Sequence, residues 1–145
     1  MKLNPYLLIM LCVGTQLYAD GSDLMTNNRE TYQLAAQVAQ LYLRYTYETG
    51  ATNNSCSLKG SSICTILNRL SEKTKSFYKP ARDDLRQLAK DTELAFRYFD
   101  FTGSADDRRI FVNSLINLLK ATAPLLTDAE NTACKALIEN LLKKI

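Results

Sequence analysis

Apolar residues recur along most of the chain at the spacing of an amphipathic α-helix, and no stretch shows the strict alternation of a half-buried β-strand. This pattern predicts five helices, at about residues 28–48, 62–77, 80–100, 104–122 and 127–145. The longest connection, between the first two helices, has about ten residues and reaches only about 33 Å when fully extended. Because short connections favour antiparallel neighbours, the sequence predicts a single-domain, all-α, up-down antiparallel bundle of four to five helices.

Capping signals mark several of the predicted helix ends. Asn27 and Glu30 fit a capping arrangement at the start of the first helix. Gly103 and Ser104 combine a C-terminal glycine with an N-cap serine between the third and fourth helices. The sequence TDAE at 127–130 is a capping box that opens the last helix. The boundaries of the last two helices therefore rest on local signals as well as on the apolar pattern.

The first and last predicted helices differ in how much of their surface is apolar. The last helix carries one continuous stripe, which predicts that it is committed to the core through Leu137, Ile138 and Leu141. The first helix carries two stripes, and a helix that is apolar over so much of its surface is usually covered on more than one side. The two stripes are formed by Leu34, Val38, Leu41 and Tyr45, and by Tyr32, Ala36, Ala39, Leu43 and Tyr47.

Residues 1–19 have a different pattern, which is typical of a secretory signal peptide. Lys2 precedes a short apolar run, which small or polar residues follow, and the run is too short to cross a bilayer as a helix. Cleavage after Ala19 is favoured, with cleavage after Gly21 as the alternative, and residues 20–145 then form the mature domain. We expect the protein to be secreted, or periplasmic if its source is bacterial, and we expect no membrane span.

The mature chain is nearly neutral and contains no histidine. Removing Lys2 lowers the 18 basic residues to 17, against 15 acidic residues, so the net charge falls from +3 to +2, and the basic residues are scattered. Nucleic-acid binding is therefore not expected, because it normally requires a clustered basic face. The absence of histidine removes the usual catalytic triads, histidine zinc sites and the commonest general base.

Two pairs of adjacent acids, Asp83/Asp84 and Asp106/Asp107, and the pair of Asp91 with Glu93 are the remaining candidates for catalysis. Adjacent residues on a helix point about 100° apart, so such a pair does not converge on one bond. Both adjacent pairs also fall in predicted first turns, where the helix dipole favours negative charge. We therefore expect no catalytic residues, no metal site and no cofactor, and the chain is not predicted to be an enzyme.

Three cysteines remain once the signal peptide, which contains Cys12, is removed. Cysteines at these spacings in an oxidising compartment usually form disulfides. Cys56 and Cys64 are predicted to pair, and Cys134 then remains free on the apolar face of the last helix, where a cysteine behaves as a small hydrophobe. The competing pairing, Cys64 with Cys134, would join the second helix to the last and leave Cys56 free.

The polar connection around Cys56 also contains Asn53 in the sequon Asn-Asn-Ser. In a secreted protein this is an acceptor site for N-glycosylation, and it matters only if the source is eukaryotic.

Tyrosines concentrate in the second half of the first predicted helix, at Tyr42, Tyr45 and Tyr47. Packing in the core or at its edge is the simpler interpretation of this cluster. The functional interpretation is a partner-binding face, because tyrosine is enriched at protein interfaces. We expect the three side chains to divide unevenly, with at least one of them substantially exposed.

Two functions of different kinds fit these features. The first is a small secreted helical bundle that binds another protein, as a signal, inhibitor or effector, without catalysis. The alternative is a secreted or periplasmic carrier that holds a lipid or another small apolar ligand in the bundle core. An apolar cavity large enough for a ligand would distinguish the second function from the first.

Overall fold

The computed structural model describes residues 21–49, 60–76 and 79–145, and this part of the chain is helical without any strand. The all-helical prediction is therefore confirmed for the described residues. The predicted signal peptide, Asn53 and Cys56 lie outside them. The helices are α2 (Gly21–Thr49), α3 (Gly60–Lys73), α4 (Lys79–Thr102), α5 (Ala105–Thr122) and α6 (Asp128–Leu142), with short 3₁₀ segments η2 (Thr74–Ser76) and η3 (Ala123–Leu125).

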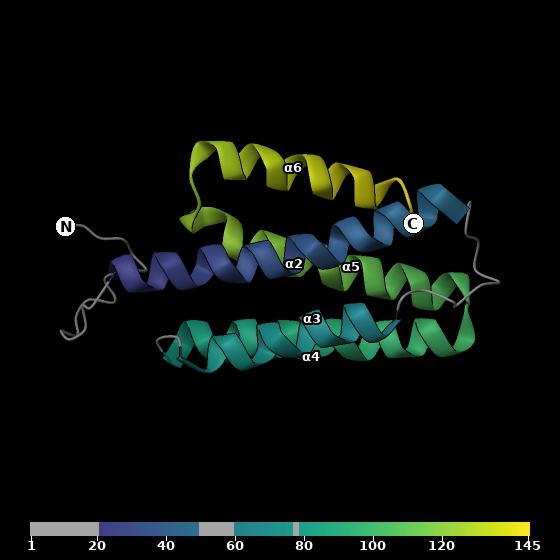
Figure 1. Cartoon of the computed structure of the whole chain (residues 1–145), viewed down its shortest axis with the longest axis horizontal. Helices are drawn as coiled ribbons and strands as arrows, with labels where there is room; N and C mark the ends of the chain where they lie inside the picture. The colour runs from purple at the N-terminus through teal and green to yellow at the C-terminus, as the bar shows by residue number, and fades with distance from the viewer. Residues whose placement is uncertain (1–20, 50–59, 77–78) are drawn as a thin grey trace.

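Four of the helices surround a common interior, and the fifth lies against the outside of two of them. Each of α2, α3, α4 and α5 packs against the next, and α5 closes the ring by packing against α2. Helix α6 packs against α2 and α5. Consecutive helices run in opposite directions, so that α2, α4 and α6 all end on the right of Figure 1. None of the described helices is both long enough and apolar enough to cross a bilayer.

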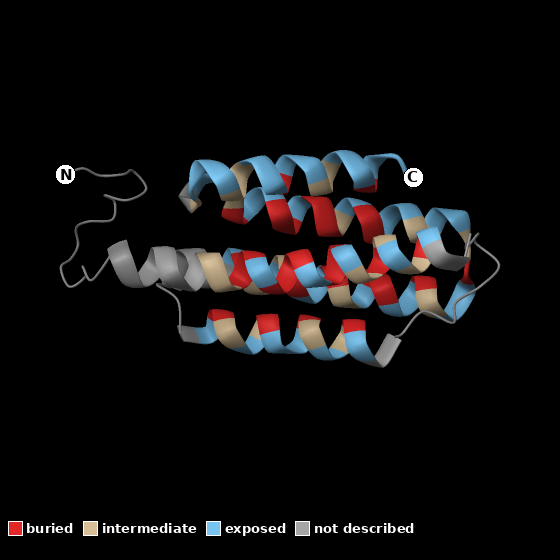
Figure 2. Ribbon diagram, turned by 45° about the horizontal axis from the view of Figure 1, so that its top comes forward, coloured by how far each residue is buried: buried red, intermediate tan, exposed pale blue. Residues whose placement is uncertain are grey.

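The interior is built around a cluster of aromatic rings. Tyr42, Phe96, Phe99 and Phe111 are among the largest fully buried side chains. The ring of Phe111 lies 5.3 Å from that of Phe96 and 5.6 Å from that of Tyr42, both in edge-on geometry, and 6.3 Å from that of Phe99 in a stacked one. Figure 2 shows the buried residues on the sides of the helices that face one another. The cluster thus joins α2, α4 and α5 in one core.

The local signals at Gly103, Ser104 and Thr127 mark helix ends in the structure as predicted. Gly103 has a φ of 65°, the left-handed conformation that glycine adopts at least cost, and its amide donates to the carbonyl oxygen of Phe99 over 2.8 Å. The Ser104 side chain accepts a hydrogen bond from the Asp107 amide over 3.1 Å. Both bonds of the capping box between Thr127 and Glu130 are present at the start of α6. These predictions are confirmed.

Two boundaries differ from the prediction. Helix α2 begins at Gly21 rather than near residue 28, so Asn27 lies within a helix and is not its cap. Residues 21–27 contain no proline, and nothing in their sequence stops a helix from extending toward the N-terminus. Helix α3 ends at Lys73 and continues only as η2, where the Thr74 hydroxyl donates to the Ser71 carbonyl oxygen over 2.9 Å. Such a local bond competes with the α-helical pattern.

Helix α6 is less deeply embedded than its apolar stripe predicts. Leu141 and Cys134 are buried, but Leu137 and Ile138 are only half-buried, and Leu142 and Ile145 are exposed. Leu137 and Ile138 still pack against the core cluster, so the prediction that they and Leu141 commit this helix to the core is confirmed, with a shallower burial than expected. The physical reason is that only α2 and α5 pack against α6 extensively, so its stripe is covered over part of its width.

Candidate functional site

The three tyrosines near the end of α2 have very different environments. Tyr42 is 1% exposed, Tyr45 is half-buried, and Tyr47 is 86% exposed. Successive helical residues turn by about 100°, so residues only five positions apart reach both the core and the solvent. The expected uneven division is confirmed. Tyr42 is a core residue in this structure, whereas most of the Tyr47 side chain is exposed to solvent.

Tyr42 is also unusual as a core residue, because its polar atom is not satisfied. Its ring packs edge-on against Phe99 and Phe111, at 6.4 and 5.6 Å between centroids. Its hydroxyl oxygen is buried without a hydrogen bond of good geometry to any described residue, and the Thr46 hydroxyl is close enough to act only as a weak partner. The nearby Thr46 hydroxyl instead donates to the Tyr42 carbonyl oxygen over 2.8 Å. Burial raises the pKa of the Tyr42 hydroxyl, so the group stays neutral.

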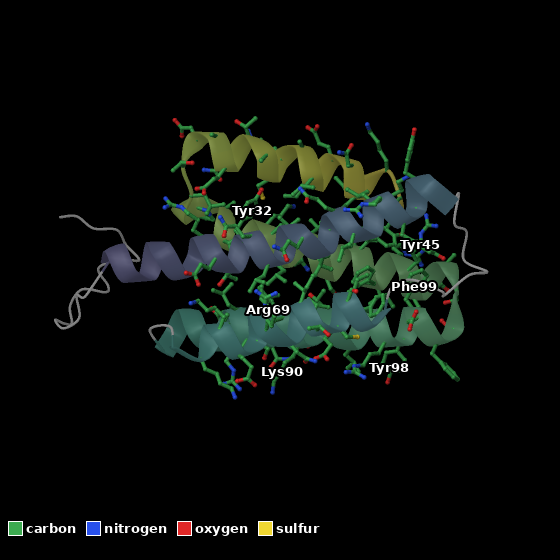
Figure 3. The ribbon with its side chains drawn as sticks, in the orientation of Figure 1. Tyr32, Tyr45, Arg69, Lys90, Tyr98 and Phe99 are labelled. Atoms are coloured by element: carbon green, nitrogen blue, oxygen red, sulfur yellow. The ribbon has the colours of Figure 1, made fainter. Side chains whose placement is uncertain are left out.

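Three large apolar side chains lie in a row on the outer side of α4. Leu94, Tyr98 and Phe101 are 53%, 57% and 88% exposed. Their spacing, four residues and then three, places them on one face of the helix. Figure 3 shows Tyr98 on the side of α4 that faces away from the other helices. These three residues are called the α4 stripe below.

Polar side chains that are hydrogen-bonded to one another lie along both sides of the α4 stripe. Arg97 donates to Glu93 with an Nη2–Oε2 distance of 2.9 Å, and both side chains are close enough to Cys64 of α3 to act on its thiol electrostatically. On the side of α5, the Thr102 hydroxyl donates to the Asp107 carboxylate. The α4 stripe is therefore an apolar strip with a polar rim.

The remaining exposed apolar side chains lie toward the same end of the molecule as the α4 stripe. At this end α2, α4 and α6 finish and α3 and α5 begin, on the right of Figure 1. An aromatic side chain has about 150–250 Å² of surface, and Tyr47 of α2 and Tyr98 and Phe101 of α4 each expose more than half of it to solvent. The large hydrophobic residues that are exposed in the structure are Tyr47, Leu94, Tyr98, Phe101, Ile110, Leu142 and Ile145.

The sequence analysis did not identify the α4 stripe, although the signal is present. The apolar residues on the inward face of this helix include Leu85, Ala89 and Phe96, which are buried. The remaining face should then be polar, but two of its three bulky apolar residues, Tyr98 and Phe101, are aromatic. A second apolar stripe on a helix whose first stripe already fills the core is the pattern that would have revealed this surface.

The structure keeps Cys64 and Cys134 apart. Cys64 lies in the first turns of α3, near Glu93 and Arg97 of α4, and is partly exposed. Cys134 is buried on α6, and its thiol donates to the Leu119 carbonyl oxygen of α5 over 3.6 Å. Neither cysteine is bonded to another described cysteine. The pairing of Cys64 with Cys56 stays a prediction, because Cys56 lies outside the described residues.

A groove of about 500 Å³ lies between the end of α5 and the first half of α6. It is open to solvent on one side, so it lies at the surface rather than in the bundle core. Its walls are mainly apolar, and two lysines stand at its rim. The lining residues are Lys120, Ala123, Pro124, Asn131, Cys134, Lys135 and Ile138.

The adjacent acids at the start of α5 have structural partners. Asp106 forms an ion pair with Arg109 one turn later, at 2.5 Å, and Asp107 accepts hydrogen bonds from Ser104 and Thr102. Both carboxylates lie in the first turn, where the helix dipole stabilises them. Within the described ranges no three potential metal-binding side chains come together. Asp106 and Asp107 therefore have structural roles at the start of α5.

No family model matches the chain, and comparison with curated proteins and with solved structures finds no similar protein.

Proposed function

We propose that the chain is a secreted protein that binds another protein, and that it acts by this contact rather than by catalysis. The observation that carries the proposal is the α4 stripe. Exposed apolar surface is unfavourable in water, and Leu94, Tyr98 and Phe101 remain exposed although the same helix already supplies Phe96 and Phe99 to the core. A surface of this kind is typical of an interaction site.

The chemistry of the α4 stripe suits a protein partner. Aromatic side chains are enriched at protein interfaces, and the polar pairs beside the stripe would form the rim of such an interface. The spacing of Leu94, Tyr98 and Phe101 is that of one helix face, which matches the seam between two packed helices. We therefore infer that the partner presents an amphipathic helix to α4.

Tyr47 supports a second point of contact at the same end of the molecule. It is the member of the predicted tyrosine site that is exposed, while Tyr45 lies at the core edge and Tyr42 holds the ring cluster together. The tyrosine-bearing part of α2 would then serve both in core packing and in partner binding, the two interpretations that the sequence allows. Its inner side stabilises the fold, and its outer side is available to the partner.

Secretion is part of the proposal and is supported by the sequence. The pattern of residues 1–19 is that of a signal peptide, and a disulfide between Cys56 and Cys64 would form in the oxidising compartment to which it leads. In a bacterial source the corresponding location is the periplasm.

Carriage of a small apolar ligand is the alternative function. The proposed location in the bundle core has less support, because the rings of Tyr42, Phe96, Phe99 and Phe111 pack there against one another. The surface groove between α5 and α6 is the feature that favours a ligand.

The decisive experiment compares two exposed apolar residues in the same half of the molecule. A partner is first captured from the source fluid by cross-linking to the wild-type protein and is then purified. Its affinity is measured by calorimetry for the wild type, for Phe101→Ser in the α4 stripe and for the matched control Leu142→Ser on α6. We expect Phe101→Ser to weaken binding at least tenfold, as removal of an interface hot spot does, and Leu142→Ser to change it less than twofold.

Unfolding in urea controls for damage to the fold, and both variants should retain the wild-type transition, because both side chains are exposed. Equal affinities for the wild type and Phe101→Ser would refute the role of the α4 stripe. Equal losses in both variants would show nonspecific attraction to apolar surface instead of a defined site.

A further inference from the structure

We propose that the groove between α5 and α6 binds a small amphiphilic anion, an unbranched carboxylate of medium chain length. The carboxylate would lie between Lys120 and Lys135, and the chain would lie along the apolar walls. This inference does not rest on the protein-binding proposal, because it concerns other helices and another surface. The two can fail separately.

The walls of the groove suit an alkyl chain. Ala123, Pro124 and Ile138 contribute apolar surface, and Cys134 closes the wall from α6. The volume of about 500 Å³ lies within the range of about 300–1,000 Å³ that is common for small-ligand sites. Because the groove is open along one side, a slender chain can lie in it without any helix moving.

The rim of the groove determines the charge of the ligand. Lys120 and Lys135 are exposed, and neither forms an ion pair with any residue that the structure describes. No acidic residue belongs to the lining. The Asn131 side-chain amide already donates to the Leu126 carbonyl oxygen over 3.2 Å. Two free ammonium groups above an apolar wall favour a ligand with an anionic head and an apolar tail.

Cys134 contributes to this site as part of its wall and not as a nucleophile. Burial raises the pKa of its thiol, so the reactive thiolate is disfavoured. The thiol also donates to the Leu119 carbonyl oxygen, which directs its polarity toward α5. The proposed binding is therefore reversible and involves no covalent step.

Calorimetry with hexanoate, octanoate and decanoate, each below its aggregation concentration, tests the proposal on the purified protein. We expect one carboxylate per chain, with affinity rising about twofold to fourfold for every added methylene group as more apolar surface is buried. Decanol, which has the same chain without the charge, should bind more weakly than decanoate. Added salt should weaken decanoate binding and leave decanol binding unchanged, because only the former depends on exposed charges.

Matched charge variants locate the site. The double variant Lys120→Gln/Lys135→Gln should weaken decanoate binding about threefold to tenfold and remove most of its salt dependence. The control Lys90→Gln/Lys143→Gln removes two exposed lysines elsewhere, one of them on the outer side of α4 in Figure 3, and should bind decanoate as the wild type does. Amide chemical shifts that change on binding should cluster within residues 119–138.

Three results would overturn the proposal. The first is the absence of decanoate binding below its aggregation concentration. The second is decanol binding as tightly as decanoate, which would remove the role of the lysines. The third is an equal loss of affinity in the rim variant and the control variant, which would indicate general electrostatic attraction instead of a site in the groove.

Discussion

Phe111 and Phe101 offer a direct comparison of the two roles that one residue type plays in this molecule. Phe111 of α5 is fully buried and contacts three other rings, whereas Phe101 of α4 is 88% exposed. Truncation of each to alanine removes the same atoms. The difference in stability between Phe111→Ala and Phe101→Ala therefore measures the effect of the surroundings of each ring and not of the residue type.

The structure sets the expected magnitudes. Phe→Ala at a fully buried site costs about 3–5 kcal/mol, through lost transfer energy and the cavity that remains. This is a large part of the roughly 5–15 kcal/mol that stabilises a domain of this size. Phe111→Leu keeps much of the volume but loses the three ring contacts, which contribute about 0.5–1.5 kcal/mol each beyond area burial, so we expect a loss of at least about 1.5 kcal/mol that stays below the loss in Phe111→Ala. Phe101→Ala should stay within about 0.5 kcal/mol of the wild type.

Urea unfolding followed by far-ultraviolet circular dichroism measures all three variants. The midpoint should fall steeply for Phe111→Ala, moderately for Phe111→Leu and hardly at all for Phe101→Ala, with similar slopes throughout. The reasoning would be refuted if Phe101→Ala destabilised the protein by more than about 1.5 kcal/mol. Such a loss would mean that Phe101 is covered in solution, and the α4 stripe would then be part of the core.

Three further predictions concern buried polar groups and thiols. Tyr42→Phe removes a buried hydroxyl that has no hydrogen bond of good geometry in the described part of the chain. We expect this variant to be more stable than the wild type by about 1 kcal/mol in urea unfolding. A decrease in stability of more than about 1 kcal/mol would show that the hydroxyl has a partner. Burial raises the pKa of the Asp100 carboxyl, so the folded state binds its proton more tightly than the unfolded state, and stability is lost as the pH rises from the ordinary carboxyl pKa through the raised one. Asp100→Asn should therefore unfold at higher urea than the wild type at pH 7, and this advantage should vanish as the pH falls below the ordinary carboxyl pKa; an advantage that persists in acid would contradict the assignment. Peptide mapping of the protein purified from its source should recover Cys56 linked to Cys64 and Cys134 as a free thiol. A Cys64–Cys134 peptide would contradict both the prediction and the separation of these two cysteines on α3 and α6.

The parts of the fold that depend on neighbouring residues were predictable from the sequence. Gly103 and Ser104 end one helix and begin the next because a left-handed glycine and an N-cap hydroxyl act over a few residues. The capping box at Thr127 has the same local character. The start of α2 was not predictable in this way, because Asn27 has the chemistry of a cap but also fits within a longer helix.

The parts that depend on the number of covering helices were not predictable. An apolar stripe shows which side of a helix faces inward, but it does not show how wide a surface the neighbours cover. Leu142 belongs to the stripe of α6 and is exposed, since the bundle offers this helix only α2 and α5 as extensive neighbours, and Ile145, predicted to continue the helix, lies beyond its end and is exposed too. Tyr98 and Phe101 lie outside the inward stripe of α4, and only the structure shows that no described helix covers them.

The position of α6 also determines when the chain can complete its fold during synthesis. Tyr32 of α2 is buried in the folded protein and lies near Cys134 and Glu130 of α6. Arg29 of α2 forms an ion pair with Glu130 at 3.1 Å. Helix α2 is synthesised before α6, so these residues of α2 stay in contact with solvent or with chaperones until α6 emerges from the ribosome. A released chain that ends before Thr127 should therefore be able to pack the rings of α2, α4 and α5 while one flank of α2 is still bare. Helix α6 therefore completes a bundle whose other described helices can associate before α6 is made.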